Sequence, residues 1–581
     1  MPRFPYRDAG LSPLEAAAFL LDRFAFGPRP GEAARVAEGG LEAWVDRQLG
    51  PPLPAPALDR ALAGLDSLDA PLDDLAERYR RGGNIAKRAE AAGYIPRGAE
   101  KNGDAYRDGT RRYMADTGLR LYRELVPTLV GAKLYGAVLA ESQLREVLAD
   151  VWFNHFNVTA RGNGVQAALR YDRDAIRPRV LSRFRDLLGA TARHPAMLRY
   201  LTNDRSRAAA GTPTPLGPAR GRAGLNENYG RELLELHTLG VGGGYTEADV
   251  EAVARAFTGW TVAPAGQGPE RLRRYRQRLD RVDRAARRAG APGVVREGAF
   301  VFRPDWHDAA PKTVLGAALP AGRGIEDGED VLDLLAAHPS TARHVARRLA
   351  VRFVADDPPE AVVAALARRF TETDGSLAAT VAAIPEHPLF WAQARAAGGQ
   401  PSKVKTPFEL VASALRATDA RVSGVRSLTA ALQQMGEPVY FRESPDGFPD
   451  HAEAWINAGL LLNRMRFGLR LASGRLRRVA PRLDRLTGGQ EPESAEAALD
   501  TLSAALLPGR DLGPTRAALV PLIRTPDVAS RVEAAAERAQ PGASAPDPDL
   551  PDDDAELPPA EGVDLATVAG VILGSPAFQR Q

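Results

Sequence analysis

The chain has 581 residues, of which 44% are hydrophobic and 26% charged, a composition typical of soluble globular proteins and not of fibrous or disordered ones. It contains no Cys, which excludes disulfides, thiolate metal sites, iron–sulfur clusters and cysteine nucleophiles. With 76 basic and 73 acidic residues, the nearly balanced charge indicates no global electrostatic partner. The sequence shows no secretory signal and no 18-residue apolar run, so we expect a cytoplasmic protein without a membrane span.

Most of the chain predicts α-helix, because apolar residues recur at spacings of three and four with Ala, Leu, Arg and Glu between them. Three cap sequences mark helix starts: Ser12-Pro-Leu-Glu15, Thr246-Glu-Ala-Asp249 and Thr406-Pro-Phe-Glu409. Three His-Pro pairs, at His194, His338 and His387, favour helix boundaries over metal ligands. We therefore expect a mainly α protein: a multi-helix, largely orthogonal assembly with long loops.

Changes in composition divide the chain into eight segments. They are an N-terminal helical segment (1–77), a flexible, loop-like charged insertion (78–112), a central helical region with the polar motifs (113–265), an Arg-rich inserted helix (266–298), a second helical region (299–400), a C-terminal helical region (401–539), a disordered acidic Pro-rich linker (540–562) and a C-terminal docking helix (563–581). The Arg-rich stretch 271–288 holds nine Arg and two Asp, and a solvated face is favoured there over binding of nucleic acid.

The run from Gly224 to Gly240, GLNENYGRELLELHTLG, is the most informative polar motif. On a helix, Asn228, Glu232 and Glu235 share one face, and Arg231 lies on a ladder beside it. His237 follows just before Gly240, whose position indicates a helix C-cap. Such a cluster can bind a divalent cation or hold a protonated carboxyl as a general acid, whereas the structural alternative is a salt network bridged by Arg231.

Two further polar groups stand out. In Asp150-Val-Trp-Phe-Asn-His-Phe-Asn157, Asn154 and His155 lie on an aromatic background, where the alternative is a core His satisfied by one hydrogen bond. In WHDAAPKTVLG, His307 and Asp308 can act as ligands or as an oriented base, and Lys312 follows four residues later.

The chain resembles a known family, the bacterial domain of unknown function numbered 1800. The motifs that carry the resemblance are Leu11-Ser-Pro-Leu-Glu-Ala-Ala, Arg23-Phe-Ala-Phe-Gly27, Trp152-Phe-Asn-His-Phe156, the run from Asn226 to Gly240, Tyr245-Thr-Glu-Ala-Asp-Val, Phe257-Thr-Gly-Trp260, His307-Asp308, Pro339-Ser-Thr-Ala-Arg343, Lys403-Val-Lys-Thr-Pro-Phe-Glu409 and Pro445-Asp-Gly-Phe-Pro449. The resemblance implies no activity. It does imply a partner encoded nearby, of sulfatase-like or twin-arginine-exported character.

Two hypotheses follow. In the first, the protein is a metal-assisted or carboxylate acid/base enzyme of hydrolase type, with a divalent metal as its candidate cofactor. His155, Glu232, His237, His307 and Asp308 are its metal ligands, and Glu232, Glu235 and His155 are catalytic. Asn154, Asn228, Arg231 and Lys312 bind substrate. In the second hypothesis the protein is a helical scaffold for a partner, and the same motifs form a buried polar network. An open pocket with an unpaired carboxylate distinguishes the enzyme from the scaffold.

Overall fold

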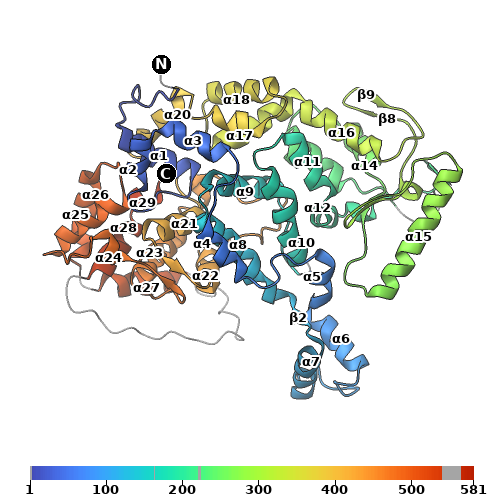
Figure 1. Ribbon diagram of the computed structural model, residues 1–581, viewed down its shortest axis with the longest axis horizontal. Helices are drawn as coiled ribbons and strands as arrows, with labels where there is room; N and C mark the ends of the chain where they lie inside the picture. Colours follow the sequence, from blue (N-terminus) through green and yellow to red (C-terminus); the bar gives the residue numbers. More distant parts are fainter. Residues whose placement is uncertain (1–2, 163, 220–223, 526, 540–563) are drawn as a thin grey trace.

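The structure, a computed structural model, describes residues 3–162, 164–219, 224–525, 527–539 and 564–581 (Figure 1). Within them the mainly α prediction is confirmed, since 59% of the described residues are helical, in 29 α-helices and eight shorter 3-10 or π-helical elements. The first seven are α1 (Pro13–Phe24), α2 (Glu32–Gly39), α3 (Leu41–Leu49), α4 (Pro56–Ala63), α5 (Leu72–Arg78), α6 (Gly82–Ala91) and α7 (Asp104–Thr117). The next eight are α8 (Val126–Leu139), α9 (Gln143–His155), α10 (Gly164–Arg170), α11 (Phe184–Arg193), α12 (Pro195–Tyr200), α13 (Asn228–Glu232), α14 (Glu247–Ala256) and α15 (Pro269–Arg288).

The second half of the chain supplies the remaining helices. They are α16 (Glu326–Ala337), α17 (Pro339–Phe353), α18 (Glu360–Glu372), α19 (Leu377–Ala382), α20 (Pro388–Ala392), α21 (Pro407–Ala417), α22 (Arg426–Gln434), α23 (Ala458–Ala472), α24 (Leu483–Leu486), α25 (Ala495–Leu506), α26 (Leu512–Ile523), α27 (Val528–Ala539), α28 (Leu565–Gly574) and α29 (Pro576–Gln579). Two π-helical turns, η2 (Tyr171–Ile176) and η5 (Leu233–Thr238), follow α10 and α13. No helix in the described ranges is both long enough and apolar enough to cross a membrane.

Strands are few and short. The largest sheet in the described part of the chain is antiparallel and has the order β5 (Trp260–Val262), β7 (Phe300–Phe302), β6 (Val295–Glu297). A hairpin of β8 (Lys312–Val314) and β9 (Ala317–Leu319) pairs Lys312 with Leu319.

The predicted helix starts have the expected cap chemistry. Ser12, Thr246 and Thr406 each form a complete capping box with the acidic residue three positions later. The histidines of the three His-Pro pairs are N-caps as well, because the Nδ1 atoms of His194, His338 and His387 accept hydrogen bonds from the backbone N–H groups of Ala196, Ser340 and Leu389 at 3.1, 3.1 and 3.2 Å.

One hydrophobic core runs through the molecule from Phe4 to Phe578, and α8, α9, α17 and α21 lie in its interior. A second, small core consists of Ala86 and Ala89 of α6 and Ile95 of the following loop, and Tyr106 and Tyr113 of α7 pack against it. Both helices project from the lower edge of the molecule in Figure 1. The segment predicted as a flexible, loop-like insertion is thus largely helical, because these apolar residues give two short helices a surface to share. The Arg-rich helix α15 stands at the right edge and is exposed on most of its length, as expected.

The predicted acidic linker at 540–562 lies outside the described residues. After it, the chain packs against the core again. Instead of one docking helix there are two, α28 and α29, and α28 packs against α23 and α25. Glycines permit the close contact between α23 and α28, since a Cβ at Gly468 would lie 2.9 Å from the carbonyl oxygen of Gly570. The end of the described chain then pairs with Lys405, whose backbone N–H donates to the carbonyl of Gln579 at 2.8 Å.

Candidate functional site

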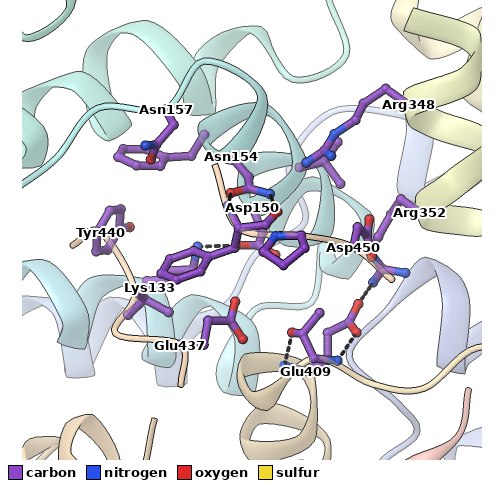
Figure 2. A pocket seen from close by; sticks show the side chains of 16 residues that line it. Lys133, Asp150, Asn154, Asn157, Arg348, Arg352, Glu409, Glu437, Tyr440 and Asp450 are labelled. Carbon is purple, nitrogen blue, oxygen red and sulfur yellow. Dashed lines mark hydrogen bonds and ion pairs between the residues drawn. The ribbon is translucent and has the colours of Figure 1, made fainter. Parts of the chain in front are cut away.

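A charged pocket lies where α8, α9, α17 and α21 meet the loop that follows α22 (Figure 2). It leaves about 40 Å³ for the centres of water-sized molecules, which is room for about three of them. Its lining consists of Lys133, Asp150, Val151, Phe153, Asn154, Asn157, Arg348, Arg352, Thr406, Glu409, Glu437, Val439, Tyr440, Phe448, Pro449 and Asp450. We call these residues the charged pocket.

Two asparagines at the end of α9 hold the loop that forms one wall of the charged pocket. Asn154 donates to the carbonyl of Phe448 at 2.8 Å and accepts from the backbone N–H of Phe448 at 2.7 Å. Asn157 donates to the carbonyls of Arg442 and Ser444 at 3.3 and 2.8 Å. The amide of Asn154 is therefore occupied by the protein itself, which makes it a positioning residue for the wall.

Most charges in the charged pocket are paired. Lys133 forms an ion pair with Asp150, and its Nζ atom lies 4.8 Å from the ring centroid of Phe408. Arg352 Nη2 lies 2.8 Å from Glu409 Oε1, although neither terminal nitrogen of Arg352 makes a well-directed hydrogen bond.

Asp450 closes the same side of the pocket. Its carboxylate lies 3.4 Å from Lys403 Nζ, and Lys403 also binds Asp356. Burial by itself would raise the pKa of Asp450, but Lys403, Arg348 and Arg352 lower it, so that this group is a carboxylate.

Glu437 differs from these carboxylates because it has no ion-pair partner within 4.0 Å among the described residues. It is 5% exposed, and its Oε2 atom accepts a hydrogen bond from the backbone N–H of Phe408 at 2.8 Å. Burial, followed by the nearby charge of Asp150, raises the pKa of Glu437 to about 8. At neutral pH the charged pocket therefore contains a protonated carboxyl group.

Arg348 is the cation of the charged pocket that, like Glu437, has no ion-pair partner among the described residues. Its Nε atom is buried without a hydrogen-bond partner, and no carboxylate in the described residues lies within 4.0 Å of its guanidinium. Its neighbour on α17, Arg347, faces the surface and pairs with the exposed Asp357 at 3.6 Å. Arg348 thus brings a positive charge to the pocket that no direct contact neutralises.

Tyr440 provides the strained part of the wall. Its φ angle is +70°, a left-handed conformation that is rare for a bulky residue. The conformation is held by a hydrogen bond from the N–H of Ala160 to the carbonyl of Tyr440 at 2.7 Å and by an edge-on contact with the ring of Phe153, whose centroid lies 4.6 Å away. Backbone strain of this kind is concentrated at functional sites.

His155 and His237, both predicted as site residues, lie beside the charged pocket together with His344; we call the three the histidine cluster. The ring centroid of His155 lies 6.3 Å from that of His237 and 5.6 Å from that of His344. His155 Nε2 is hydrogen-bonded to the carbonyl of His237 at 3.0 Å, and His344 Nε2 to that of Leu236 at 3.0 Å. His155 is therefore a buried histidine satisfied by the backbone, which was the structural alternative.

Burial keeps the histidine cluster neutral. Burial, and then the neighbouring His344, lower the pKa of His237 to about 3. Burial, His344 and Arg348 lower the pKa of His155 well below its usual range. The Nε2 atom of His237 has no hydrogen-bond partner, so this imidazole is the least satisfied member of the cluster.

Glu232 and Glu235 come close together, as the spacing predicts, but on a half-exposed surface outside the charged pocket. Burial and the charge of Glu235 raise the pKa of Glu232. Arg231 does not bridge the pair, because it binds Glu247 through two hydrogen bonds of 2.9 and 2.7 Å. Asn228 is exposed on the same side. Beyond Glu232 the helix becomes the π-turn η5, which the α-helical spacing did not predict.

His307, Asp308 and Lys312 form a separate, closed group with Asp327. Lys312 Nζ donates to Asp327 Oδ2 at 2.6 Å, and His307 Nε2 lies 3.3 Å from the same oxygen. Asp308 binds Arg255 at 2.8 Å. The side chains of His307, Lys312 and Asp327 are fully buried, and none lines the charged pocket.

The structure therefore brings the predicted metal ligands into different environments. His155 and His237 share the histidine cluster, whereas His307 and Asp308 are bonded to Thr258, Asp327 and Arg255. In the part of the chain that the structure describes, no group of three or more His, Asp or Glu side chains is arranged to hold a metal ion. The shared metal site stays a prediction from the motifs.

Sequence reasoning missed the charges that line the pocket: Lys133, Arg348, Arg352, Glu409, Glu437 and Asp450. The available indication was the set of resemblance motifs, since Trp152–Phe156, Lys403–Glu409 and Pro445–Pro449 all contribute to the pocket lining. Asn154 was the one predicted residue that lines it.

Comparison with known proteins identifies the family of the chain. The family model described as Protein of unknown function (DUF1800) matches residues 19–580, nearly the whole chain. No curated protein and no solved structure matches the chain. The chain therefore belongs to the family described as Protein of unknown function (DUF1800).

Proposed function

We propose that the protein is a carboxylate acid/base enzyme and that its active site is the charged pocket. The observation that carries the proposal is Glu437, a buried carboxyl group without an ion-pair partner in a pocket whose other carboxylates are all paired. A scaffold gains nothing from such a group, because a buried unpaired carboxyl costs free energy. An enzyme uses it as a proton donor near neutral pH.

In this proposal Glu437 is the general acid. Its proton passes from the carboxyl oxygen to a substrate oxygen or nitrogen that develops negative charge, and Glu437 becomes a carboxylate. The ion pair of Lys133 and Asp150 lies on the same side of the pocket, with Lys133 Nζ 5.1 Å from the ring centroid of Tyr440. Asn154 and Asn157 keep the opposite wall in place through the loop at Arg442–Phe448.

A spectroscopic experiment tests the state of Glu437 without knowledge of the substrate. Difference infrared spectra of the wild-type protein and of Glu437→Gln, recorded from pH 5 to 10, should differ by one protonated-carboxyl band that disappears with a midpoint near the pKa of about 8. The amide oxygen of the variant can accept the same hydrogen bond from Phe408, so the variant should fold. A band that is absent at pH 7, or that persists in Glu437→Gln, contradicts the proposal.

An activity screen tests the chemistry. On a panel of ester, amide and lactone substrates, Glu437→Gln should lose about 10²- to 10⁴-fold in rate, the usual contribution of a general acid. Activity should fall as pH rises above about 8, because the donor must be protonated. Glu232→Gln is the matched comparison: if it abolishes activity and Glu437→Gln does not, the active site lies at α13 instead.

The scaffold hypothesis has one observation of its own, the closed group of His307, Lys312 and Asp327. These fully buried side chains contact one another and do not line the charged pocket, as expected for a polar network that specifies packing. Co-purification of a partner with the wild-type protein would favour the scaffold, provided that Glu437→Gln loses binding of this partner and shows no loss of any catalytic rate.

A further inference from the structure

The cations of the charged pocket differ in how directly they are paired. Lys133 is neutralised by Asp150 and Arg352 by Glu409, and Asp450 is bound by Lys403 from behind the wall. Glu437 is uncharged at neutral pH. Among the pocket cations this leaves Arg348 without a counter-ion within 4.0 Å in the described residues.

No described carboxylate directly contacts the guanidinium of Arg348 on the sides that face away from the other pocket cations either. The histidine cluster lies beside it, and Arg348 contributes to the lowered pKa of His155, after burial and His344. These imidazoles offer Arg348 no negative charge, and the Nε2 atoms of His155 and His344 are bonded to backbone carbonyls. Arg348 helps to lower the pKa of Asp450, but this carboxylate lies more than 4.0 Å from the Arg348 guanidinium and 3.4 Å from Lys403 Nζ.

A second guanidinium has free donors in the same pocket. Arg352 is 3% exposed, and its Nη1 atom has no hydrogen-bond partner although it is buried. Arg348 and Arg352 are four residues apart on α17, so they lie on one face of the helix, as Figure 2 shows. Buried, unsatisfied guanidinium donors are costly unless a ligand binds them.

We propose that Arg348 and Arg352 bind the carboxylate group of a small substrate in the charged pocket. The inference rests on the proposed function, because it assigns a substrate class to the same site. A carboxylate fits on two counts: its planar oxygens match the guanidinium donors that have no partner, and it has three heavy atoms for a cavity of about three waters. A phosphate group has five heavy atoms in a tetrahedral arrangement and matches neither the space nor the planar donors as well.

Binding of acetate and formate to the full chain, measured by ligand-observed NMR at constant ionic strength, tests this assignment. Both anions should bind saturably at millimolar concentration and more tightly than inorganic phosphate or chloride. Arg348→Gln should weaken acetate binding by about 10- to 100-fold, the loss expected for one charge-assisted hydrogen bond, and Arg348→Lys by less. Arg347→Gln, the neighbouring surface variant, should bind acetate as the wild type does.

The outcomes separate the two proposals. Equal binding of acetate by wild type and Arg348→Gln, or tighter binding of phosphate than of acetate, overturns the carboxylate subsite. Glu437→Gln should retain acetate binding, because the substituted amide fills the same space as the carboxyl group and Arg348 is unchanged. If Arg348→Gln abolishes acetate binding while the infrared band of Glu437 is missing, the subsite stands and the acid/base mechanism fails.

Discussion

The side chain of Asn154 and the backbone of Phe448 are joined by two hydrogen bonds across 294 residues of sequence. The pair fixes the loop that carries Pro449 and Asp450 against the end of α9. Asn154→Ala should therefore destabilise the protein by about 1–3 kcal/mol, because two half-buried backbone groups of Phe448 lose their partner. Urea unfolding measures this change, and the exposed Asn228→Ala should stay within about 0.5 kcal/mol of wild type.

Gly447 faces Asn154 in the same contact. Its φ is +76°, and a Cβ at this position would lie 2.3 Å from the carbonyl oxygen of Asn154. Gly474 has a similar φ of +69° but no atom within 4 Å of its Cβ position. Gly474→Ala should therefore cost about 1–2 kcal/mol from the backbone conformation alone. Gly447→Ala should destabilise the protein by about 1–3 kcal/mol more than Gly474→Ala, because the steric clash with Asn154 is added to the backbone cost.

Thermal unfolding of both alanine variants measures this difference. Equal melting temperatures for the two would mean that the loop can move away from Asn154 at no cost, and would remove the argument that the wall of the charged pocket is rigid.

The histidine cluster predicts a loss of stability in acid. His237 has a pKa of about 3 in the folded protein against 6.5 in an unfolded chain, so below pH 6.5 the unfolded state binds the additional proton. The stabilising contribution is present above pH 6.5 and is lost as pH falls toward the folded pKa, amounting to about 2 kcal/mol between roughly pH 8 and 5.

Urea midpoints recorded between pH 5 and 8 measure this loss, and His237→Gln should show a flatter profile. His237→Gln removes only one member of the cluster, so part of the slope should remain from His155, whose pKa is also lowered by burial. A wild-type stability that does not change from pH 8 to 5 contradicts the neutral state of the cluster.

Lys312 and Asp327 allow a test of whether their group is structural. Lys312→Met should cost about 3–5 kcal/mol, because it leaves a fully buried carboxylate short of one partner. The double variant Lys312→Met, Asp327→Leu should be less destabilised than Lys312→Met alone. A double-mutant cycle of unfolding free energies measures the coupling. If Lys312→Met is as stable as wild type but loses catalytic activity, Lys312 binds substrate, as its sequence motif suggested.

Local chemistry explains which expectations were confirmed. The capping boxes at Ser12 and Thr406 and the boundary positions of the His-Pro histidines depend on residues within three positions of one another, and each formed as expected. The pairing of Glu232 with Glu235 is local in the same sense.

The charged pocket could not be predicted in this way. Its charges come from four helices and a loop, so that Lys133 and Asp450 are neighbours only through the fold. The spacing within one motif also failed where the backbone changed type, since η5 ends the α-helical register of the run from Asn226 to Gly240. The aromatic background of His155 correctly indicated burial, but nothing in its motif revealed Arg348 beside it.

The contacts of the last described residues determine when the segment around Glu409 can become fully bonded during synthesis. The amide of Gln581 donates to Glu409 at 2.8 Å, and Lys405 Nζ donates to the carbonyl of Phe578 at 2.8 Å. Both partners belong to the segment that carries Thr406 and Glu409 to the charged pocket. On the ribosome Glu409 can pair with Arg352 as soon as its own helix is made, whereas its hydrogen bond with Gln581 can form only after 172 further residues.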